Sequence, residues 1–224
     1  MNKIILQNQL EYLSSFRKKT DTLIEEMEAY AKEHNVPILA WESADFLEQL
    51  VLMKNPRRVL ELGTAIAYST IRVARNLIGK AVIHSIEKSP DNVLVAKEFI
   101  VKSGLGAKIK ILEGDAVNVM PQLKKKYDII FLDADKEDYK RLFDYSLVLL
   151  KKSGLLVVDN LLWHGFAAST RVPLQYKEST NHIREFNLLF MNQPNLKSSI
   201  IPIGDGIGLG VKIELRTNPP DEFN

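Results

Sequence analysis

The chain has 224 residues, of which 46% are hydrophobic and 26% are charged, and its 30 basic and 28 acidic side chains leave a net charge of +2. This composition is close to that of globular proteins, which excludes wholesale disorder, a coiled coil and collagen. The absence of cysteine excludes disulfides, thiolate zinc sites and cysteine nucleophiles.

The length predicts a single domain that spans residues 1–224. No apolar run reaches the roughly 18 residues that a membrane span requires. The first ten residues lack the small-residue cleavage site of a signal peptide. We therefore expect a cytoplasmic protein without a membrane partner.

Residues 1–56 carry the apolar spacing of helices. Apolar side chains recur every three or four positions from Leu6 to Phe16. Asp21 is placed to cap a second helix that ends before Pro37, and a third helix ends at Pro56. We expect the apolar faces of these N-terminal helices to pack on the domain or to form a subunit interface.

Residues 57–215 alternate between strand and helix patterns and form the predicted sheet core. Repeated strand–helix–strand units predict right-handed crossovers on a parallel sheet. The apolar runs are nearly continuous, as expected when helices cover both faces. The predicted strands are Arg58–Leu62, Ala81–Glu87, Lys108–Leu112, Tyr127–Asp133 and Gly154–Asp159, and the helices between them are Tyr68–Leu77, Asp91–Lys102, Ala116–Lys124 and Tyr139–Leu150.

The C-terminal part has a different pattern. A helix is predicted near Ile183–Met191, and two further apolar runs, Ser198–Ile203 and Ile207–Leu215, flank the turn Gly204-Asp205-Gly206. This order predicts an antiparallel hairpin at the edge of a doubly wound, mostly parallel seven-stranded α/β sheet. Trp163–Thr180 has no clear period and reads as a mobile loop over a site, whereas residues 216–224 form a polar tail.

Ligands of open α/β sheets bind beyond the carboxyl ends of the strands. The first predicted strand leads into the small-residue turn from Gly63 to Ser69, which would let a ligand approach the backbone and the helix N-terminus. The second strand ends at Glu87, an acidic residue that could accept hydrogen bonds from ribose hydroxyls. Taken alone, such a turn is equally compatible with a purely architectural role.

Three polar residues follow the fourth and fifth predicted strands: Asp133, Asp159 and Asn160. Adjacent parallel strands would bring them close together, and two carboxylates with an amide oxygen suit Mg²⁺. The alternative is that Asp159 or Asn160 caps a helix while Asp133 lies at the surface. Lys136 lies on the same edge and is a candidate general base, provided that its pKa is lowered from the ordinary value of about 10.4.

Five motifs in this order resemble the cation-dependent O-methyltransferases of the catechol and caffeoyl-CoA type. They are Glu61–Ser69, Ser85-Ile86-Glu87, Gly114-Asp115-Ala116, Phe131–Lys136 and Val158-Asp159-Asn160. The resemblance covers about residues 25–213 and implies the class I methyltransferase, Rossmann-like fold, with S-adenosylmethionine as methyl donor. It departs from the family pattern at Ala67, where glycine is usual.

The resemblance also implies residue roles. Glu61 and Gly63 would lie beside the methionine part of the cofactor and Ser69 near its carboxylate. Glu87 would hold the ribose, and Asp115 and Ala116 would lie at the adenine edge. Asp133 would contact the cofactor and, together with Asp159 and Asn160, bind Mg²⁺ or another divalent cation, and Lys136 would be the catalytic base.

Three further stretches resemble the bacterial enzymes that methylate 5-hydroxyuridine at the tRNA wobble position. They are Met27–Ile38, Phe190–Pro194 and Ile200–Gly206. By this resemblance the backbone of Leu39 would touch the cofactor, the protein would be a homodimer, and the partner would be a tRNA anticodon stem-loop. The alternative substrate is a small catechol-like or caffeoyl-type phenol, since both substrate classes offer two adjacent oxygens to a metal.

Overall fold

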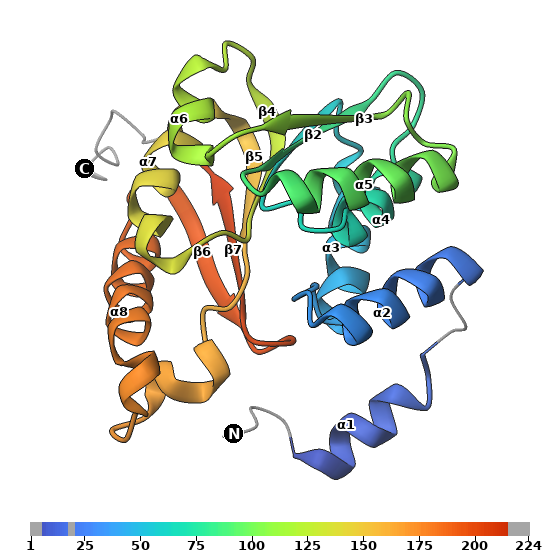
Figure 1. Cartoon of the computed structure of the whole chain (residues 1–224). Helices are drawn as coiled ribbons and strands as arrows, with labels where there is room; N and C mark the ends of the chain where they lie inside the picture. Colours follow the sequence, from blue (N-terminus) through green and yellow to red (C-terminus); the bar gives the residue numbers. More distant parts are fainter. Residues whose placement is uncertain (1–5, 18–20, 215–224) are drawn as a thin grey trace.

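A seven-stranded sheet forms the centre of the computed structural model, which describes residues 6–17 and 21–214. Its strand order is β3-β2-β1-β4-β5-β7-β6 (Figure 1). The first five strands pair in parallel, and β7 is antiparallel to both β5 and β6. The strands are β1 (Arg58–Leu62), β2 (Val82–Glu87), β3 (Ile109–Glu113), β4 (Tyr127–Leu132), β5 (Leu150–Val158), β6 (Leu196–Ile201) and β7 (Ile207–Lys212).

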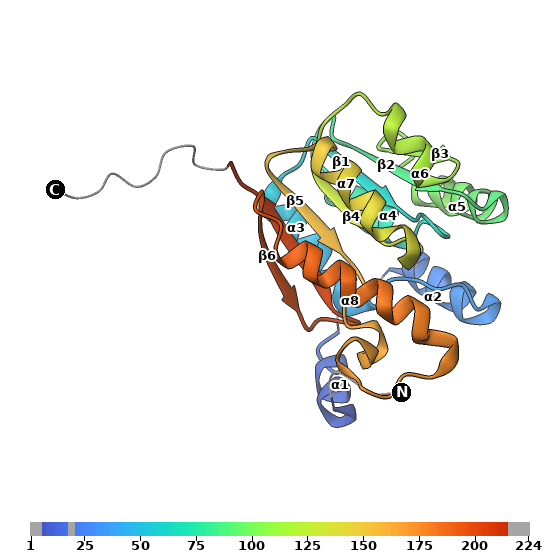
Figure 2. The ribbon, with the colours of Figure 1, turned by 90° about the vertical axis from the view of Figure 1, so that its left-hand side faces the viewer.

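Helices cover both faces of this sheet, and the views in Figures 1 and 2 show them in two layers. One layer holds α2 (Thr22–His34), α3 (Trp41–Lys54), α4 (Tyr68–Arg75) and α5 (Pro90–Ser103). The other holds α6 (Ala116–Val119), α7 (Tyr139–Leu149) and α8 (Lys177–Met191). The predicted doubly wound fold with a C-terminal hairpin is therefore confirmed.

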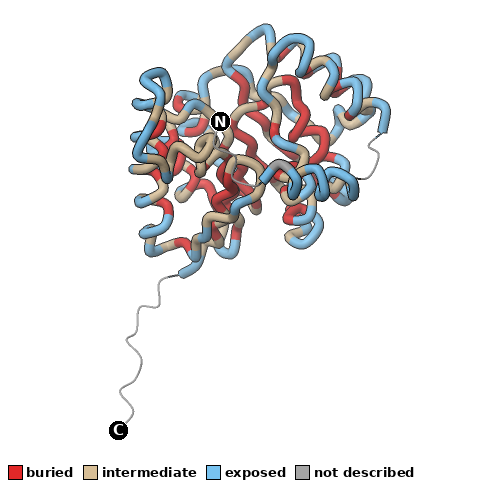
Figure 3. The backbone as a smooth tube through the Cα atoms, turned by 90° about the horizontal axis from the view of Figure 1, so that it is seen from below, coloured by how far each residue is buried: buried red, intermediate tan, exposed pale blue. Residues whose placement is uncertain are grey.

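Alternate residues of each strand enter two separate cores. Val59 packs with α2–α5, whereas the next residue, Leu60, packs with α6–α8. The same alternation holds for Ile129 and Ile130 in β4, because successive side chains of a strand point to opposite faces. Figure 3 shows the buried residues, in red, in the interior of the molecule, with exposed residues around them. A strand buried on both faces needs the continuous apolar runs that the sequence shows.

Several predicted boundaries were wrong. Strand β5 begins at Leu150 rather than at Gly154, because Leu150 already pairs with Tyr127 of β4, and the register shifts before Leu155 pairs with Ile129. Helix α8 begins at Lys177 rather than at Ile183, since its first turn carries few apolar side chains. It is preceded by two short 3-10 helices, Trp163–Ala168 and Leu174–Tyr176, so the segment predicted as a loop has local helical structure.

The N-terminal region matches its predicted pattern only in part. Asp21 caps α2 by accepting a hydrogen bond from the Ile24 N–H at 3.0 Å, as predicted. Helix α1 (Gln7–Ser14) does not bury its apolar side chains, since Leu6 and Phe16 beside it are both 65% exposed. The predicted tail, residues 216–224, lies outside the described residues. Within the described part of the chain, no helix is both long and apolar enough to cross a bilayer.

Candidate active site

Hydrogen bonding between the strands continues one residue beyond their ends. The Asp133 N–H donates to the Leu62 carbonyl at 3.0 Å, and the Asp159 N–H donates to the Leu132 carbonyl at 3.0 Å. These backbone bonds bring the loops after β1, β4 and β5 to one edge of the sheet. The polar residues that follow the strands therefore lie where the sequence predicts a binding site.

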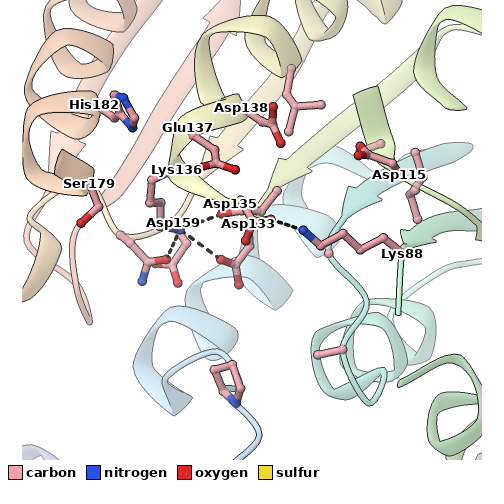
Figure 4. A pocket seen from close by; sticks show the side chains of 18 of the residues that line it. Lys88, Asp115, Asp133, Asp135, Lys136, Glu137, Asp138, Asp159, Ser179 and His182 are labelled. Atoms are coloured by element: carbon pink, nitrogen blue, oxygen red, sulfur yellow. Dashed lines mark hydrogen bonds and ion pairs between the residues drawn. The ribbon is translucent and has the colours of Figure 1, made fainter. Parts of the chain in front are cut away.

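A cavity of about 840 Å³ opens at this edge (Figure 4). Most of the predicted site residues line it, from the loops after β1 to β5. Those that line the cavity are Gly63, Glu87, Asp115, Ala116, Asp133, Lys136, Asp159 and Asn160.

Three predicted residues lie behind the cavity wall. Leu39 is buried in the core, and the preceding Pro37 and Ile38 line the cavity in its place. Glu61 is fully buried and Ser69 is 8% exposed. Their side chains therefore support the turn from below instead of forming the surface that a ligand would meet.

The turn after β1 has positive φ at three positions, Gly63, Ala65 and Ala67, with φ of +45° at Ala65. Gly63 has φ +99°, and an ideal Cβ there would lie 3.1 Å from the Asp133 carbonyl carbon and overlap its oxygen. Ala67 has φ +69°, a conformation that glycine adopts freely and alanine adopts with strain. Ala67, where the sequence departs from the glycine usual in the family, therefore lies at a position whose backbone favours glycine. Its side chain is fully buried, and this packing holds the turn in place.

Glu87 is held rigidly at the end of β2. One carboxylate oxygen accepts a hydrogen bond from the Ala65 N–H and the other from the Ser89 N–H, both at 2.8 Å. The side chain is buried at 7% exposure and faces the cavity. A carboxylate has about four lone-pair positions, so both oxygens can still accept from two ligand hydroxyls.

Asp115 combines a structural and a cavity-facing position. Its Oδ1 caps α6 by accepting a hydrogen bond from the Val117 N–H at 2.8 Å. The same side chain lies at the cavity wall beside Ala116 (Figure 4). The capping role that a strand-end aspartate often has is therefore realised here, and it fixes the direction of the carboxylate.

Glu61 forms a buried hydroxyl network below the turn. Its Oε2 accepts hydrogen bonds from Thr70 and, at 2.5 Å, from Ser85. Burial raises the pKa of Glu61 to about 7, although hydrogen bonds from Ser69, Ser85 and Thr70 act in the opposite direction. Its Oε1 is buried and has no hydrogen-bond partner among the described residues.

Lys136 lies at the centre of the cluster drawn in Figure 4. Its Nζ donates to the Tyr139 hydroxyl at 2.5 Å and to the Asn160 Oδ1 at 2.7 Å, and it lies 3.7 Å from the Asp133 Oδ1. Burial lowers the pKa of Lys136, while the charges of Asp133 and Asp159 raise it. The amine is thus positioned and partly desolvated, as a general base requires.

The two strand-end carboxylates are also poorly solvated. Burial raises the pKa of Asp133, and Lys136 opposes this shift. Burial and the charge of Asp133 raise the pKa of Asp159 to about 7. The Oδ1 of Asp159 is buried and has no hydrogen-bond donor among the described residues, so this acceptor is free to bind a ligand.

Further cavity residues come from segments with no sequence motif. Trp163 and His164 follow β5, and Ser179 and His182 lie on α8. The Trp163 ring lies tilted against the His164 ring, with centroids 5.1 Å apart, and its indole N–H donates to the Ser179 hydroxyl at 3.1 Å. Trp163 and His164 could be suspected from the sequence because they closely follow Asn160, whereas no sequence signal marks Ser179 and His182. Trp41 does not line the cavity, since Arg17 lies over its ring instead.

Comparison with known proteins gives the family. The O-methyltransferase family model matches residues 12–213. The chain belongs to the O-methyltransferase family.

Individual relatives of this O-methyltransferase agree. It is 30% identical to caffeoyl-CoA O-methyltransferase 2 of Petunia hybrida, with 93% of this chain and 92% of the relative covered. It is 30% identical to catechol O-methyltransferase of Niastella koreensis, with 74% of this chain and 77% of the relative covered. The solved structure of an O-methyltransferase from Bacillus cereus in complex with SAH is 25% identical, has a TM-score of 0.80, and covers 90% of this chain and 96% of its own. The predicted enzyme class is confirmed.

Proposed function

We propose that this O-methyltransferase transfers a methyl group from S-adenosylmethionine to one hydroxyl of a small aromatic compound with two adjacent hydroxyls, with the help of a divalent cation. The caffeoyl-CoA and catechol O-methyltransferases among its relatives support this substrate class over tRNA. The relative in complex with SAH supports the methyl donor. The observation that carries the proposal is the cluster of Lys136, Asp133, Asp159 and Asn160 beside the turn after β1.

The cofactor would occupy the side of the cavity formed by the loops after β1, β2 and β3. Glu87 would accept hydrogen bonds from both ribose hydroxyls, and Asp115 and Ala116 would border the adenine. Gly63 would allow the methionine part to approach the backbone, since no side chain fits at this position. Glu61 and Ser69 would support the turn that holds this part.

The residues after β4 and β5 fit a divalent cation. Asp133, Asp159 and Asn160 would supply two carboxylates and an amide oxygen, the hard ligands that Mg²⁺ prefers. The buried, unpartnered Oδ1 of Asp159 is an acceptor that a cation would satisfy. When bound, the cation lowers the pKa of a substrate hydroxyl and orients it.

Lys136 would then accept the proton of the substrate hydroxyl at its Nζ. Burial favours the neutral amine, as a base needs, and Tyr139 and Asn160 hold Nζ in place. The departing thioether is neutral, so no protein group has to protonate it. The work left to the protein is to align the substrate oxygen with the methyl carbon at roughly 3 Å.

The aromatic wall would receive the substrate ring. Trp163 and His164 line the cavity with ring centroids 5.1 Å apart, and Tyr176 lies edge-on to Trp163 at 6.4 Å. Flat apolar surfaces beside a polar cluster are typical of small-molecule sites. A phenol ring against this wall would direct its hydroxyls toward Lys136.

Turnover with catechol or caffeic acid, followed by mass spectrometry of the product, tests the proposal. We expect one methyl group to be added, the activity to stop with excess chelator, and Mg²⁺ to restore it. Phenol, which has a single hydroxyl, is the control substrate and should not react. The Asp159→Asn variant should bind S-adenosylmethionine but need more Mg²⁺. Full turnover in excess chelator would refute the metal-dependent mechanism.

A second candidate substrate, tRNA with 5-hydroxyuridine, is favoured by one observation. A second cavity of about 620 Å³ is lined by the basic residues Arg171, Lys177 and Arg184. The Arg184 guanidinium already donates to backbone carbonyls of residues 166, 167 and 169, whereas Arg171 and Lys177 are exposed. These two cations could contact phosphates of an anticodon stem-loop.

An Arg171→Ala/Lys177→Ala double variant separates the two candidates. For a tRNA enzyme, tRNA binding should weaken and its dependence on log salt should flatten by about 0.7–0.9 per lost phosphate contact, while catechol turnover should stay unchanged. For a small-molecule enzyme, hydroxyuridine-containing tRNA should never be methylated by the wild type. The homodimer and the cytoplasmic location stay predictions.

A further inference from the structure

Three hydrogen-bond acceptors surround the amine of Lys136. Its Nζ donates to the Tyr139 hydroxyl at 2.5 Å, to the Asn160 Oδ1 at 2.7 Å and to the Ala134 carbonyl at 3.1 Å. An ammonium group has three N–H bonds, so these contacts use its whole donor capacity. Only the Tyr139 hydroxyl and the Asn160 amide belong to side chains, and a substitution can therefore remove either of them.

The Tyr139 hydroxyl can act toward Lys136 only as an acceptor. Tyr139 directly follows the short 3-10 helix Lys136–Asp138, in which side chains three residues apart lie on the same side. Its hydroxyl donates to the Asp159 carbonyl at 3.0 Å, and a carbonyl can only accept. The single hydroxyl proton is therefore committed to Asp159, and the oxygen is left to accept from Lys136.

The ring that carries this hydroxyl is locked in the core. Tyr139 is 0% exposed and lies edge-on to Phe186 of α8, with ring centroids 5.1 Å apart. The Lys136 Nζ lies 4.5 Å from the centroid of the Tyr139 ring. A rigid, buried side chain thus joins the amine to the backbone of Asp159, just beyond the end of β5.

The two side-chain acceptors differ in their relation to the proposed metal site. The Asn160 oxygen is a proposed ligand of the cation, which would share it with Lys136. Tyr139 does not line the cavity, so its contact with the amine does not compete with a ligand. Without the Tyr139 hydroxyl, the Ala134 carbonyl would be the one remaining acceptor of the three that is not shared with the cation.

We propose that Tyr139 is a positioning residue, whose hydroxyl holds the Lys136 amine beside the reacting oxygen of the substrate while the Asn160 oxygen is engaged by the cation. The inference rests on the proposed function, because the position of the amine matters for turnover only if Lys136 is the base. Misplacing a reacting group by about 1 Å can cost about 100-fold in rate.

Two matched substitutions test this role. Tyr139→Phe keeps the buried ring and removes the hydroxyl, so Lys136 loses an acceptor and the Asp159 carbonyl loses this donor. The control is Tyr127→Phe, at the first residue of β4 and outside the cavity. Tyr127 is also 0% exposed, and its hydroxyl forms a hydrogen bond with the His84 Nδ1 at 2.9 Å. Both variants therefore lose a buried hydroxyl, and only one of them alters the surroundings of Lys136.

The first measurement does not depend on turnover. Brief treatment of the ligand-free protein with acetic anhydride, followed by mass spectrometry of the peptide that carries Lys136, reports how firmly the amine is held. We expect acetylation of Lys136 to be several-fold faster in Tyr139→Phe than in the wild type and in Tyr127→Phe. The second measurement is catechol turnover. In Tyr139→Phe, kcat should fall about 10- to 100-fold, while the KM for catechol and the Mg²⁺ affinity stay near those of the wild type.

The outcomes separate the inference from the proposed function. If acetylation and kcat are the same in Tyr139→Phe and Tyr127→Phe, the inference is wrong. If Mg²⁺ affinity falls together with kcat, the hydroxyl acts through the Asp159 carbonyl and not through Lys136, which also overturns it. If the wild type methylates no catechol, the proposed function fails, whereas a difference in acetylation still supports the hold of Tyr139 on the amine.

Discussion

Gly63 gives the sharpest quantitative prediction about the site. Replacing it with alanine has two costs, which a matched glycine allows us to separate. Gly104 also has positive φ, at +69°, but an ideal Cβ there would meet no atom within 4 Å. Gly104→Ala should therefore lose only the backbone preference, which is about 1–2 kcal/mol for left-handed alanine.

Gly63→Ala carries at least this backbone cost, since its φ of +99° lies outside the left-handed region that alanine can adopt, and it carries a steric cost as well. Its Cβ would overlap the Asp133 carbonyl oxygen, a backbone atom that can move only by parting the ends of β1 and β4. Overpacking of this kind costs about 1–3 kcal/mol more, so we expect a loss of about 2–5 kcal/mol in the free energy of unfolding. Because Asp133 would shift with its strand end, both cofactor and Mg²⁺ affinity should also fall.

Urea denaturation of the two variants and the wild type measures this difference. Gly63→Ala should be less stable than Gly104→Ala by at least about 1 kcal/mol. Equal stabilities would mean that the turn relaxes without disturbing Asp133. A large loss of stability with unchanged Mg²⁺ affinity would show that the turn does not position the proposed metal ligands.

Three other predictions concern single side chains. Glu87→Ala should weaken S-adenosylmethionine binding about tenfold or more in calorimetry, because charge-assisted hydrogen bonds to the ribose are lost. The control is Glu113→Ala, at the end of β3, which removes an ion pair with Lys97 and should leave cofactor binding unchanged. Lys136→Met should lower kcat by about 100-fold or more while cofactor affinity stays the same; a smaller drop would assign the base elsewhere. Burial raises the pKa of Glu61 from 4.5 to about 7, so folding favours its protonated form. The resulting contribution to the free energy of unfolding is complete below about pH 4.5 and is lost as the pH rises through about 7. Glu61→Gln should therefore flatten the fall in unfolding free energy of the ligand-free protein between about pH 5 and pH 8, and an unchanged slope would show that Glu61 stays ionised throughout.

The sheet and its ligand-binding edge could be predicted from the sequence because they depend on local patterns. Nearly continuous apolar runs marked β1 and β4, and the polar residues that follow β4 and β5 marked the cavity edge. The N-terminal half of α8 could not be found in this way, since its first turn is stabilised by contacts with the segment after β5 and not by its own apolar spacing.

The packing of the turn between β6 and β7 was also beyond the sequence pattern. Gly204-Asp205-Gly206 correctly predicted a hairpin turn, but a turn motif does not say what the turn packs against. Its contacts with Leu162 and His164 depend on β7 pairing with β5, a contact between distant parts of the chain. The left-handed backbone at Asn160 is likewise imposed by that packing, since asparagine adopts several other conformations equally well.

The strand order has a consequence for folding kinetics. Val59 pairs with Ile83 in β2 through a short crossover, and Ile129 pairs with Leu155 in β5 in the same way. By contrast, Val59 and Ile129 pair with each other although two strands and three α-helices separate them in the sequence. Closing that long loop is entropically costly, so contacts within each half should form before the halves join. Gly63 and Asp133 lie on opposite sides of this junction, which makes ligand binding a late event in folding and a sensitive probe of the final step.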